Sequence, residues 1–166
     1  MRVLIGCEFS GVVRDVFSRA GHYAVSCDLL PSEGDPTGHH YQGSILEVLN
    51  HGWDPAIFHP PCTYLTVSGN RWYYHPEDKA LPMKERRPHP NYPNRRTDRV
   101  AAIKFFMDLM TSNIPRICVE NPIGIMSTIY RKPDQIIQPW WFVVVPVIIK
   151  LLQVRISWDL VVKELK

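Results

Sequence analysis

Four short apolar segments, each ending at or just before a polar side chain, constrain the possible folds of this chain more than any other feature. They occupy residues 2–7, 22–27, 54–58 and 116–120. Between the first two, residues 12–20 carry apolar side chains at helical spacing, and Gly21 follows as a helix terminator. Strands that alternate with helices in this way build a mainly parallel sheet covered by helices. The sequence therefore predicts an α/β fold, with a ligand-binding edge at the carboxyl ends of the strands.

The remaining segments predict one domain with a long insertion. Residues 31–40 are a loop by composition, residues 45–49 are a brief helix or strand, and a helix with Asp98 as its N-cap ends before Pro115. Residues 70–97 are rich in proline, aromatic residues and arginine, which is typical of an irregular functional or disordered insertion. We expect a single domain over residues 1–166, with a divergent C-terminal segment from about residue 141.

The positive charge of the chain is concentrated in that insertion. The whole sequence carries a net charge of only +3, but residues 84–99 contain six basic side chains and two acidic ones. This pattern is either a solvated loop or a surface for a polyanion. Aromatic residues interleaved with arginines are typical of surfaces that stack bases and neutralise phosphates. The predicted nucleic-acid contacts are Arg71, Trp72, Arg86, Arg87, Arg95 and Arg96.

Cysteine and histidine spacing argues against several other classes of protein. The four cysteines form no C-x-x-C pair and the histidines match no tight ligand cluster, so no metal site is predicted. No secretory signal opens the sequence, and the apolar run at residues 140–149 is about half as long as a membrane span. We expect a cytoplasmic protein with reduced thiols and no membrane partner.

Four residues at the ends of the apolar segments could carry chemistry. Gly11 permits close approach of a ligand, or simply a tight turn. Asp28 could accept hydrogen bonds from ribose hydroxyls, or could serve as a turn residue. Cys62 follows two prolines and is a candidate nucleophile, although most cysteines are small buried apolar residues. Glu120 brings a carboxylate to the same predicted sheet edge, where it either pairs structurally or acts on a substrate.

Taken in order, these residues resemble the motifs of the DNA cytosine-C5 methyltransferases. Glu8-Phe9-Ser10-Gly11 is similar to the family's D-L-F-x-G cofactor loop, and Asp28 matches its acidic ribose-binding position. Residues 54–62 (DPAIFHPPC) are similar to its strand and P-P-C nucleophile motif, and Glu120-Asn121 is similar to its E-N-V motif. The similarity covers roughly residues 1–140 and is greatest to small phage and prophage methyltransferase-like proteins, so a phage-infected bacterial cell is one candidate setting.

The resemblance implies a Rossmann-like, S-adenosylmethionine-dependent methyltransferase domain that modifies cytosine C5 in DNA. Cys62 would add to C6 of the base, and Glu120 would hydrogen-bond N3 and the exocyclic amine. The base would have to be flipped out of a duplex or already single-stranded. S-adenosylmethionine is the implied cofactor, and its implied contacts are Glu8, Phe9, Ser10, Gly11, Asp28 and Pro60.

The chain departs from the family pattern in ways that keep other functions open. Val13-Arg14 stands in place of a glycine pair, and Ser44 stands where an aspartate is expected to contact the adenine amine. Residues 143–149 lack the expected glycine, and no recognition domain of the usual size is present. Two alternatives therefore remain: a non-catalytic nucleic-acid- or cofactor-binding relative of that fold, and a pyrimidine methyltransferase that acts on free nucleotides.

Overall fold

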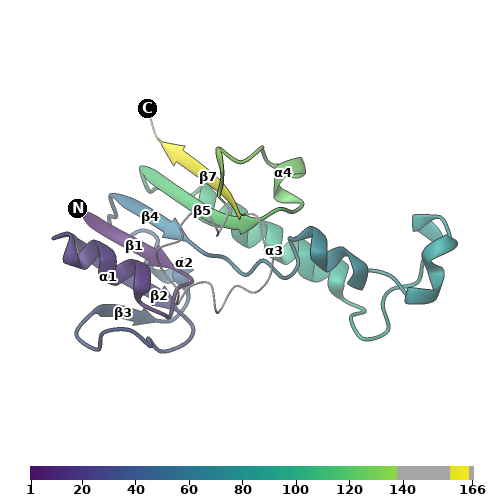
Figure 1. Cartoon of the computed structure of the whole chain (residues 1–166), viewed down its shortest axis with the longest axis horizontal. Helices are drawn as coiled ribbons and strands as arrows, with labels where there is room; N and C mark the ends of the chain where they lie inside the picture. Colours follow the sequence, from purple (N-terminus) through teal and green to yellow (C-terminus); the bar gives the residue numbers. More distant parts are fainter. Residues whose placement is uncertain (138–157, 165–166) are drawn as a thin grey trace.

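A seven-stranded sheet in the order β3-β2-β1-β4-β5-β7-β6 forms the centre of the computed structural model (Figure 1). The structure describes residues 1–137 and 158–164. Strands β1 to β5 are parallel, and β7 is antiparallel to both β5 and β6. The strands are β1 (Arg2–Gly6), β2 (Tyr23–Asp28), β3 (His39–Gln42), β4 (Pro55–Phe58), β5 (Arg116–Pro122), β6 (Gln135–Ile137) and β7 (Trp158–Glu164).

The strand order makes this a Rossmann-like α/β fold, as predicted. The chain runs outward from β1 through β2 to β3 and then returns to the other side of β1 with β4 and β5. The carboxyl ends of β1 and β4 therefore flank the point at which the order reverses, where open α/β sheets bind ligands. All four predicted apolar segments contain strands. Strand β3 corrects the prediction that His39 and His40 belong to a loop, and β7 was not predicted. The predicted departures at residues 143–149 lie outside the described residues.

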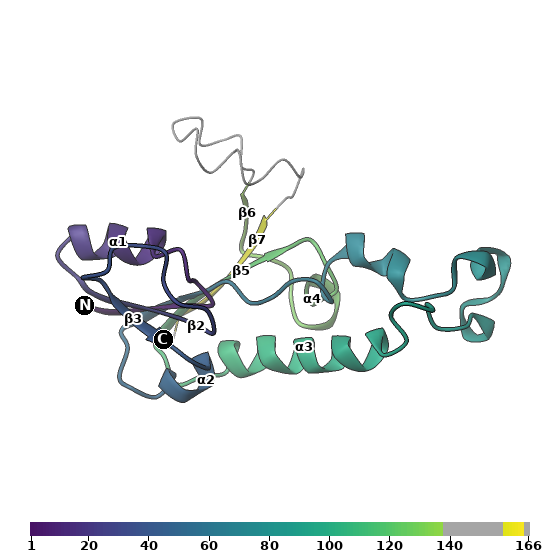
Figure 2. The same cartoon turned by 90° about the horizontal axis from the view of Figure 1, so that it is seen from below.

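Helices cover both faces of the sheet (Figure 2). Helix α1 (Val12–Arg19) lies on one face, and α2 (Ile45–Val48) and α3 (Arg95–Met110) lie on the other; a short helix, α4 (Met126–Ile129), follows β5. Strand β1 shows why both faces are apolar: Val3 and Ile5 pack toward α1, while Leu4 belongs to the larger core on the α3 side. This alternation is the two-residue period of a strand that is buried on both faces.

On the α1 face, a buried arginine packs beneath the connection from β2 to β3, where a crossover helix is usual. Parallel strands are usually joined through a crossover helix, but residues 29–38 connect β2 to β3 without one. The side chain of Arg14 is fully buried beneath this connection and donates hydrogen bonds to Ser26, Ser32 and the carbonyl of Asp35. A Cβ atom at Gly38 would lie 2.5 Å from the Arg14 guanidinium carbon. Arg14 therefore fastens the connection to α1.

Between β4 and α3 the chain forms an arm that extends away from the sheet (Figures 1 and 2). It contains three short 3-10 helices, η1 (Val67–Trp72), η2 (Pro76–Ala80) and η3 (Met83–Glu85), so the expectation of an irregular insertion is corrected. A salt bridge of 2.6 Å between Arg87 and Asp78 closes its outer part. Helix α3 begins at Arg95 after the N-cap Asn94, about one turn before the predicted start at Asp98.

Candidate active site

Cys62 and Glu120 come from neighbouring parallel strands and lie at the same edge of the sheet. Strand β4 ends at Phe58, which pairs with Val119 of β5, so the loop that carries Cys62 begins next to Glu120. Glu120 lies within β5 and is largely buried, with 14% of its side chain exposed. Cys62 and Glu120 therefore lie at the same edge of the sheet, at the carboxyl ends of parallel strands.

Backbone contacts hold the Cys62 loop against the segment that follows Glu120. The carbonyl of Cys62 accepts hydrogen bonds from the amides of Leu65 and Thr66, which turns the chain sharply. Thr66 then forms a bridge with Gly124, beyond the end of β5. A Cβ atom at position 124 would lie 2.1 Å from the carbonyl oxygen of Leu65, so only glycine permits this approach. The relative positions of Cys62 and Glu120 are therefore set by backbone packing.

The surroundings of Cys62 keep its thiol protonated near neutral pH. Burial raises the pKa of Cys62, and the negative charge of Glu120 raises it further. The carboxylate also lies 3.5 Å, Oε2 to Nδ1, from the imidazole of His59. A thiolate at Cys62 consequently requires an alkaline solution, or a partner that offsets the charge of Glu120.

A cavity of about 160 Å³ lies beside this site at the ends of β1 and β2. Asp28, Leu29 and Ser44 line one part of it, and Pro61, directly before Cys62, lines another. Its remaining lining residues are Cys7, Cys27, Gly43, Ile45 and Phe105. Polar groups at one end and apolar walls elsewhere are typical of pockets for nucleoside-containing ligands, although the volume is below the usual range of about 300–1,000 Å³.

Only one of the six predicted cofactor residues lines that cavity. Asp28 does so, and its Oδ1 accepts a hydrogen bond of 2.9 Å from the amide of Leu30, a turn that also positions Leu29. Ser44 was noticed in the sequence only as a departure from a motif, yet it lines the cavity and caps α2. Cys7, Leu29, Pro61 and Phe105 were missed, because no local pattern marks residues that converge from four separate segments.

The predicted loop Glu8–Gly11 supports helix α1 and does not line the cavity. The carboxylate of Glu8 is buried and accepts hydrogen bonds from the amide of Val13 at 2.7 Å and the hydroxyl of Ser10 at 3.0 Å. Gly11 is the N-cap with a φ of 73°, a conformation that favours glycine. Phe9 is half-buried and Pro60 is buried nearby in the Cys62 loop. The loop therefore orients the end of β1 through a capped helix.

The cysteines that line the cavity are not alternative nucleophiles. Burial is the largest cause that raises the pKa of Cys7 to about 12 and that of Cys27 to about 11, with the charge of Asp28 next. Cys7 also has a φ of 58°, which is uncommon for a residue other than glycine and turns the chain at the end of β1. Both thiols thus belong to the wall of the cavity.

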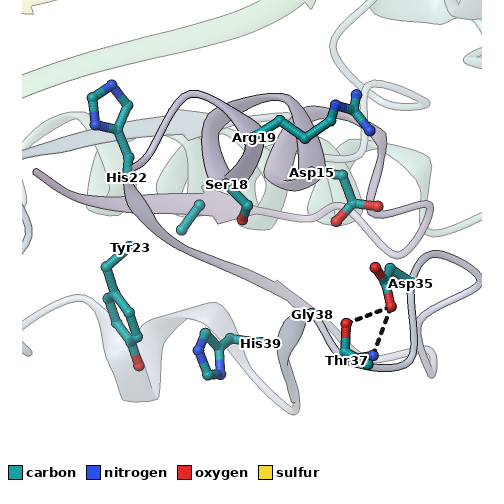
Figure 3. A pocket seen from close by; sticks show the side chains of 10 residues that line it. Asp15, Ser18, Arg19, His22, Tyr23, Asp35, Thr37, Gly38 and His39 are labelled. Atoms are coloured by element: carbon teal, nitrogen blue, oxygen red, sulfur yellow. Dashed lines mark hydrogen bonds between the residues drawn. The ribbon is translucent and has the colours of Figure 1, made fainter.

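A larger cavity of about 450 Å³ lies at the opposite edge of the sheet (Figure 3). The second half of α1 and the amino-terminal ends of β2 and β3 form it, with Arg19, Tyr23 and His39 among its lining residues. None of the predicted site residues lines it. Its place follows from the missing crossover helix between β2 and β3, which leaves this part of the sheet uncovered.

The basic residues of the arm divide into exposed and internally bound groups. Arg71 and Arg96 are exposed, and their guanidinium groups lie over Trp72 and Tyr74, respectively. Arg86 donates to two backbone carbonyls, and Arg87 is paired with Asp78. Arg95 is buried, lies over Tyr64, Tyr73 and Tyr92, and donates to the carbonyl of Thr63. The prediction that Arg95 contacts nucleic acid is therefore withdrawn.

In the described part of the chain, no helix is long and apolar enough to cross a membrane. Within residues 1–137 and 158–164, no three histidine, cysteine or acidic side chains are grouped so as to hold a metal ion. Compared with known proteins, the chain matches no family, and no curated protein is significantly similar to it.

Proposed function

We propose that this protein is an S-adenosylmethionine-dependent DNA cytosine-C5 methyltransferase. The observation that carries the proposal is the placement of Cys62 and Glu120 at one sheet edge, beside a cavity lined by Asp28 and Ser44. A nucleophile, a carboxylate that can hydrogen-bond a base, and a recess for the cofactor are the three parts that this reaction requires. The resemblance of the motifs to that family supports the same function.

Each of these residues has a separate role in the proposed reaction. Cys62 adds as a thiolate to C6 of cytosine, which makes C5 electron-rich, and it leaves again when the C5 proton is removed. Glu120 hydrogen-bonds N3 and the exocyclic amine and stabilises charge on the ring. Asp28 and Ser44 fit the ribose and adenine ends of S-adenosylmethionine, because both are polar residues that line the cavity. When bound there, the cofactor supplies the methyl group.

DNA is the proposed partner, and the arm is its proposed contact surface. The exposed guanidinium groups of Arg71 and Arg96 can neutralise phosphates, while Trp72, which is partly exposed, can stack on an unpaired base. A base within a duplex cannot reach Cys62, so the substrate is either flipped out or single-stranded.

The test of the proposed function is methyl transfer by four serine variants. We expect Cys62→Ser to abolish incorporation of labelled methyl groups into DNA, because a hydroxyl is a far poorer nucleophile than a thiolate. Cys118→Ser is the matched control: Cys118 is half-buried in β5, so its loss should cost some stability and retain activity. Cys7→Ser and Cys27→Ser should behave like the control. Full activity of Cys62→Ser would contradict the mechanism.

A non-catalytic relative of the same fold is the second candidate. The raised pKa of Cys62 and the buried Arg14 in place of a glycine favour it, because neither suits an efficient methyltransferase. Trapping with 5-fluorocytosine separates the candidates: a covalent adduct with DNA indicates the proposed enzyme, and an adduct with a free nucleotide alone indicates a nucleotide methyltransferase. Binding without any adduct indicates the non-catalytic relative.

A further inference from the structure

His59 is a side chain at the candidate site to which the proposed mechanism gives no role. It directly follows β4, and its amide donates a hydrogen bond of 2.9 Å to the carbonyl of Gly6 at the end of β1. Pro60 follows and restricts the backbone conformation of His59. The backbone of His59 is therefore fixed on both sides, and the register of β4 with β5, in which Phe58 pairs with Val119, sets His59 beside Glu120.

The imidazole contacts the carboxylate of Glu120 through one nitrogen. The Nδ1 atom lies 3.5 Å from Oε2, and 30% of the histidine side chain and 14% of the glutamate side chain are exposed. A hydrogen bond in which the ionised carboxylate accepts needs the ring proton on Nδ1. The distance is longer than that of a strong hydrogen bond, and such contacts often tighten when substrate binds.

The other imidazole nitrogen is buried. Within the described residues, Nε2 of His59 has almost no exposed surface and no hydrogen-bond partner. Burial of a polar atom without a partner is costly and is tolerated where it serves a role. A hydrogen bond from Nδ1 to Glu120 leaves Nε2 as the acceptor nitrogen of the ring.

Two thiols lie in the electrostatic field of Glu120. The carboxylate raises the pKa of Cys62 on the β4 side and that of Cys118 within β5, after burial in both cases. Among the described groups, Glu120 acts on Cys62 and Cys118 and lies beside His59, and Asp134 acts on Cys118 as well. Anything that compensates the charge of Glu120 will therefore make Cys62 more acidic.

We propose that His59 is a positioning residue: its Nδ1 atom faces the Glu120 carboxylate, holds it in place and weakens its effect on the Cys62 thiol. This inference rests on the proposed function for the roles of Cys62 and Glu120, and it adds a control element to that pair.

A double-mutant cycle on thiol alkylation tests the proposal without cofactor or DNA. The rate at which iodoacetamide modifies Cys62 is followed by mass spectrometry in the wild-type protein, His59→Ala, Glu120→Gln and the double variant. At about pH 8, we expect His59→Ala to slow alkylation about threefold and Glu120→Gln to accelerate it about threefold, because the thiolate fraction falls or rises accordingly. In the Glu120→Gln background, removal of His59 should change the rate less than about twofold.

Two further variants identify the nitrogen that matters. The amide nitrogen of asparagine lies near the position of Nδ1, and that of glutamine lies near the position of Nε2. His59→Asn should therefore keep the wild-type rate, whereas His59→Gln should behave like His59→Ala. The pH profile of alkylation should be displaced to higher pH in His59→Ala and His59→Gln alone, an effect that loss of packing would not produce.

The outcomes that would overturn the proposal are specific. They are an unchanged alkylation rate in His59→Ala, or an equal change in the wild-type and Glu120→Gln backgrounds. If the alanine variant does not fold, nitrogen NMR of the wild-type imidazole decides, because an Nε2–H tautomer contradicts the contact with Glu120. Alkylation needs no methyl transfer. If the cycle shows coupling but the protein transfers no methyl groups, the result contradicts the proposed function and leaves the inference about His59 intact.

Discussion

Arg14 is fully buried, and its hydrogen bonds show why the expected glycine is absent. The side chain donates from Nε to Asp15 at 2.7 Å and from Nη1 to Ser26 and Ser32. Burial of a guanidinium group is unfavourable unless its donors are satisfied, and here they are directed at the β2–β3 connection. The Ser26 hydroxyl continues the network to His40 at 2.8 Å. One side chain thus replaces the packing that a crossover helix would supply.

We expect Arg14→Ala to lower the free energy of unfolding by about 2–4 kcal/mol, because it removes the hydrogen bonds to Ser26, Ser32 and the carbonyl of Asp35 and opens a cavity. Arg19→Ala on the same helix is the control, since Arg19 is exposed and should change stability by less than about 0.5 kcal/mol. Urea denaturation measures both. If the free energy of unfolding falls no more in Arg14→Ala than in the control, the buried network contributes little to stability.

At the scale of elements, the arm shows that a basic segment of sequence is not one uniform surface. Arg95 and Arg99 hold the base of the arm, and Arg99 lies 3.9 Å from the centre of the Tyr73 ring. Asp78 is buried, and the hydrogen bonds from Arg87 are the main cause that lowers the pKa of this carboxyl to about 2. The interaction therefore persists well below neutral pH, and it is lost only as the carboxyl becomes protonated. Arg71 and Arg96 remain available to a partner.

We predict that the double variant Arg71→Ala, Arg96→Ala binds DNA more weakly than the wild-type protein. The slope of log affinity against log salt concentration should also be smaller. Two lost phosphate contacts should reduce the slope by about 1.8. Lys104→Ala is the matched control: its side chain is 75% exposed on α3, but it is already paired with Asp108. Fluorescence anisotropy over a salt series measures the slopes, and equal slopes in the double variant and the wild-type protein would remove the arm from the interface.

At the scale of the whole molecule, the cavity of about 160 Å³ exists only because distant segments converge. Cys7 follows β1, Asp28 ends β2, Ser44 precedes α2 and Phe105 lies in α3. The sheet brings the first three to one edge, and α3 closes the cavity from the face opposite α1. Its modest volume and the serine at position 44 lead us to expect weaker cofactor binding than is usual for enzymes of the proposed family.

We predict that Ser44→Asp tightens binding of S-adenosylmethionine about tenfold, because a carboxylate there can accept a hydrogen bond from the adenine amine. Aspartate caps a helix as well as serine does, so α2 should be retained. Ser18→Asp adds the same charge at the larger cavity on the opposite edge and should leave affinity unchanged. Calorimetry with the cofactor and its demethylated product measures both. If neither variant binds the cofactor more tightly, or if both do so equally, the adenine binds elsewhere.

Much of the fold was predictable because its signals are local. Short apolar runs located the strands at residues 2–6 and 116–119, helical spacing located the helix at residues 12–20, and Gly21 marked its end; the observed β5 extends to Pro122. Strand β3 was missed because His39 and His40 are polar, edge-strand residues with no apolar periodicity. The start of α3 was placed one turn late because Asp98 was taken as the N-cap. The N-cap in the structure is Asn94, whose side chain makes no capping hydrogen bond.

The sequence by itself determined the class of fold and the edge of the sheet at which Cys62 and Glu120 lie, because parallel strands place the residues that follow them on one side. Only the tertiary structure decided which residues line the cavity, which arginines are exposed, and that His59 contacts Glu120. The physical reason is that each of these depends on contacts between segments far apart in the chain. Local residue patterns encode backbone conformation and burial, but side-chain partners are fixed only when the segments pack together.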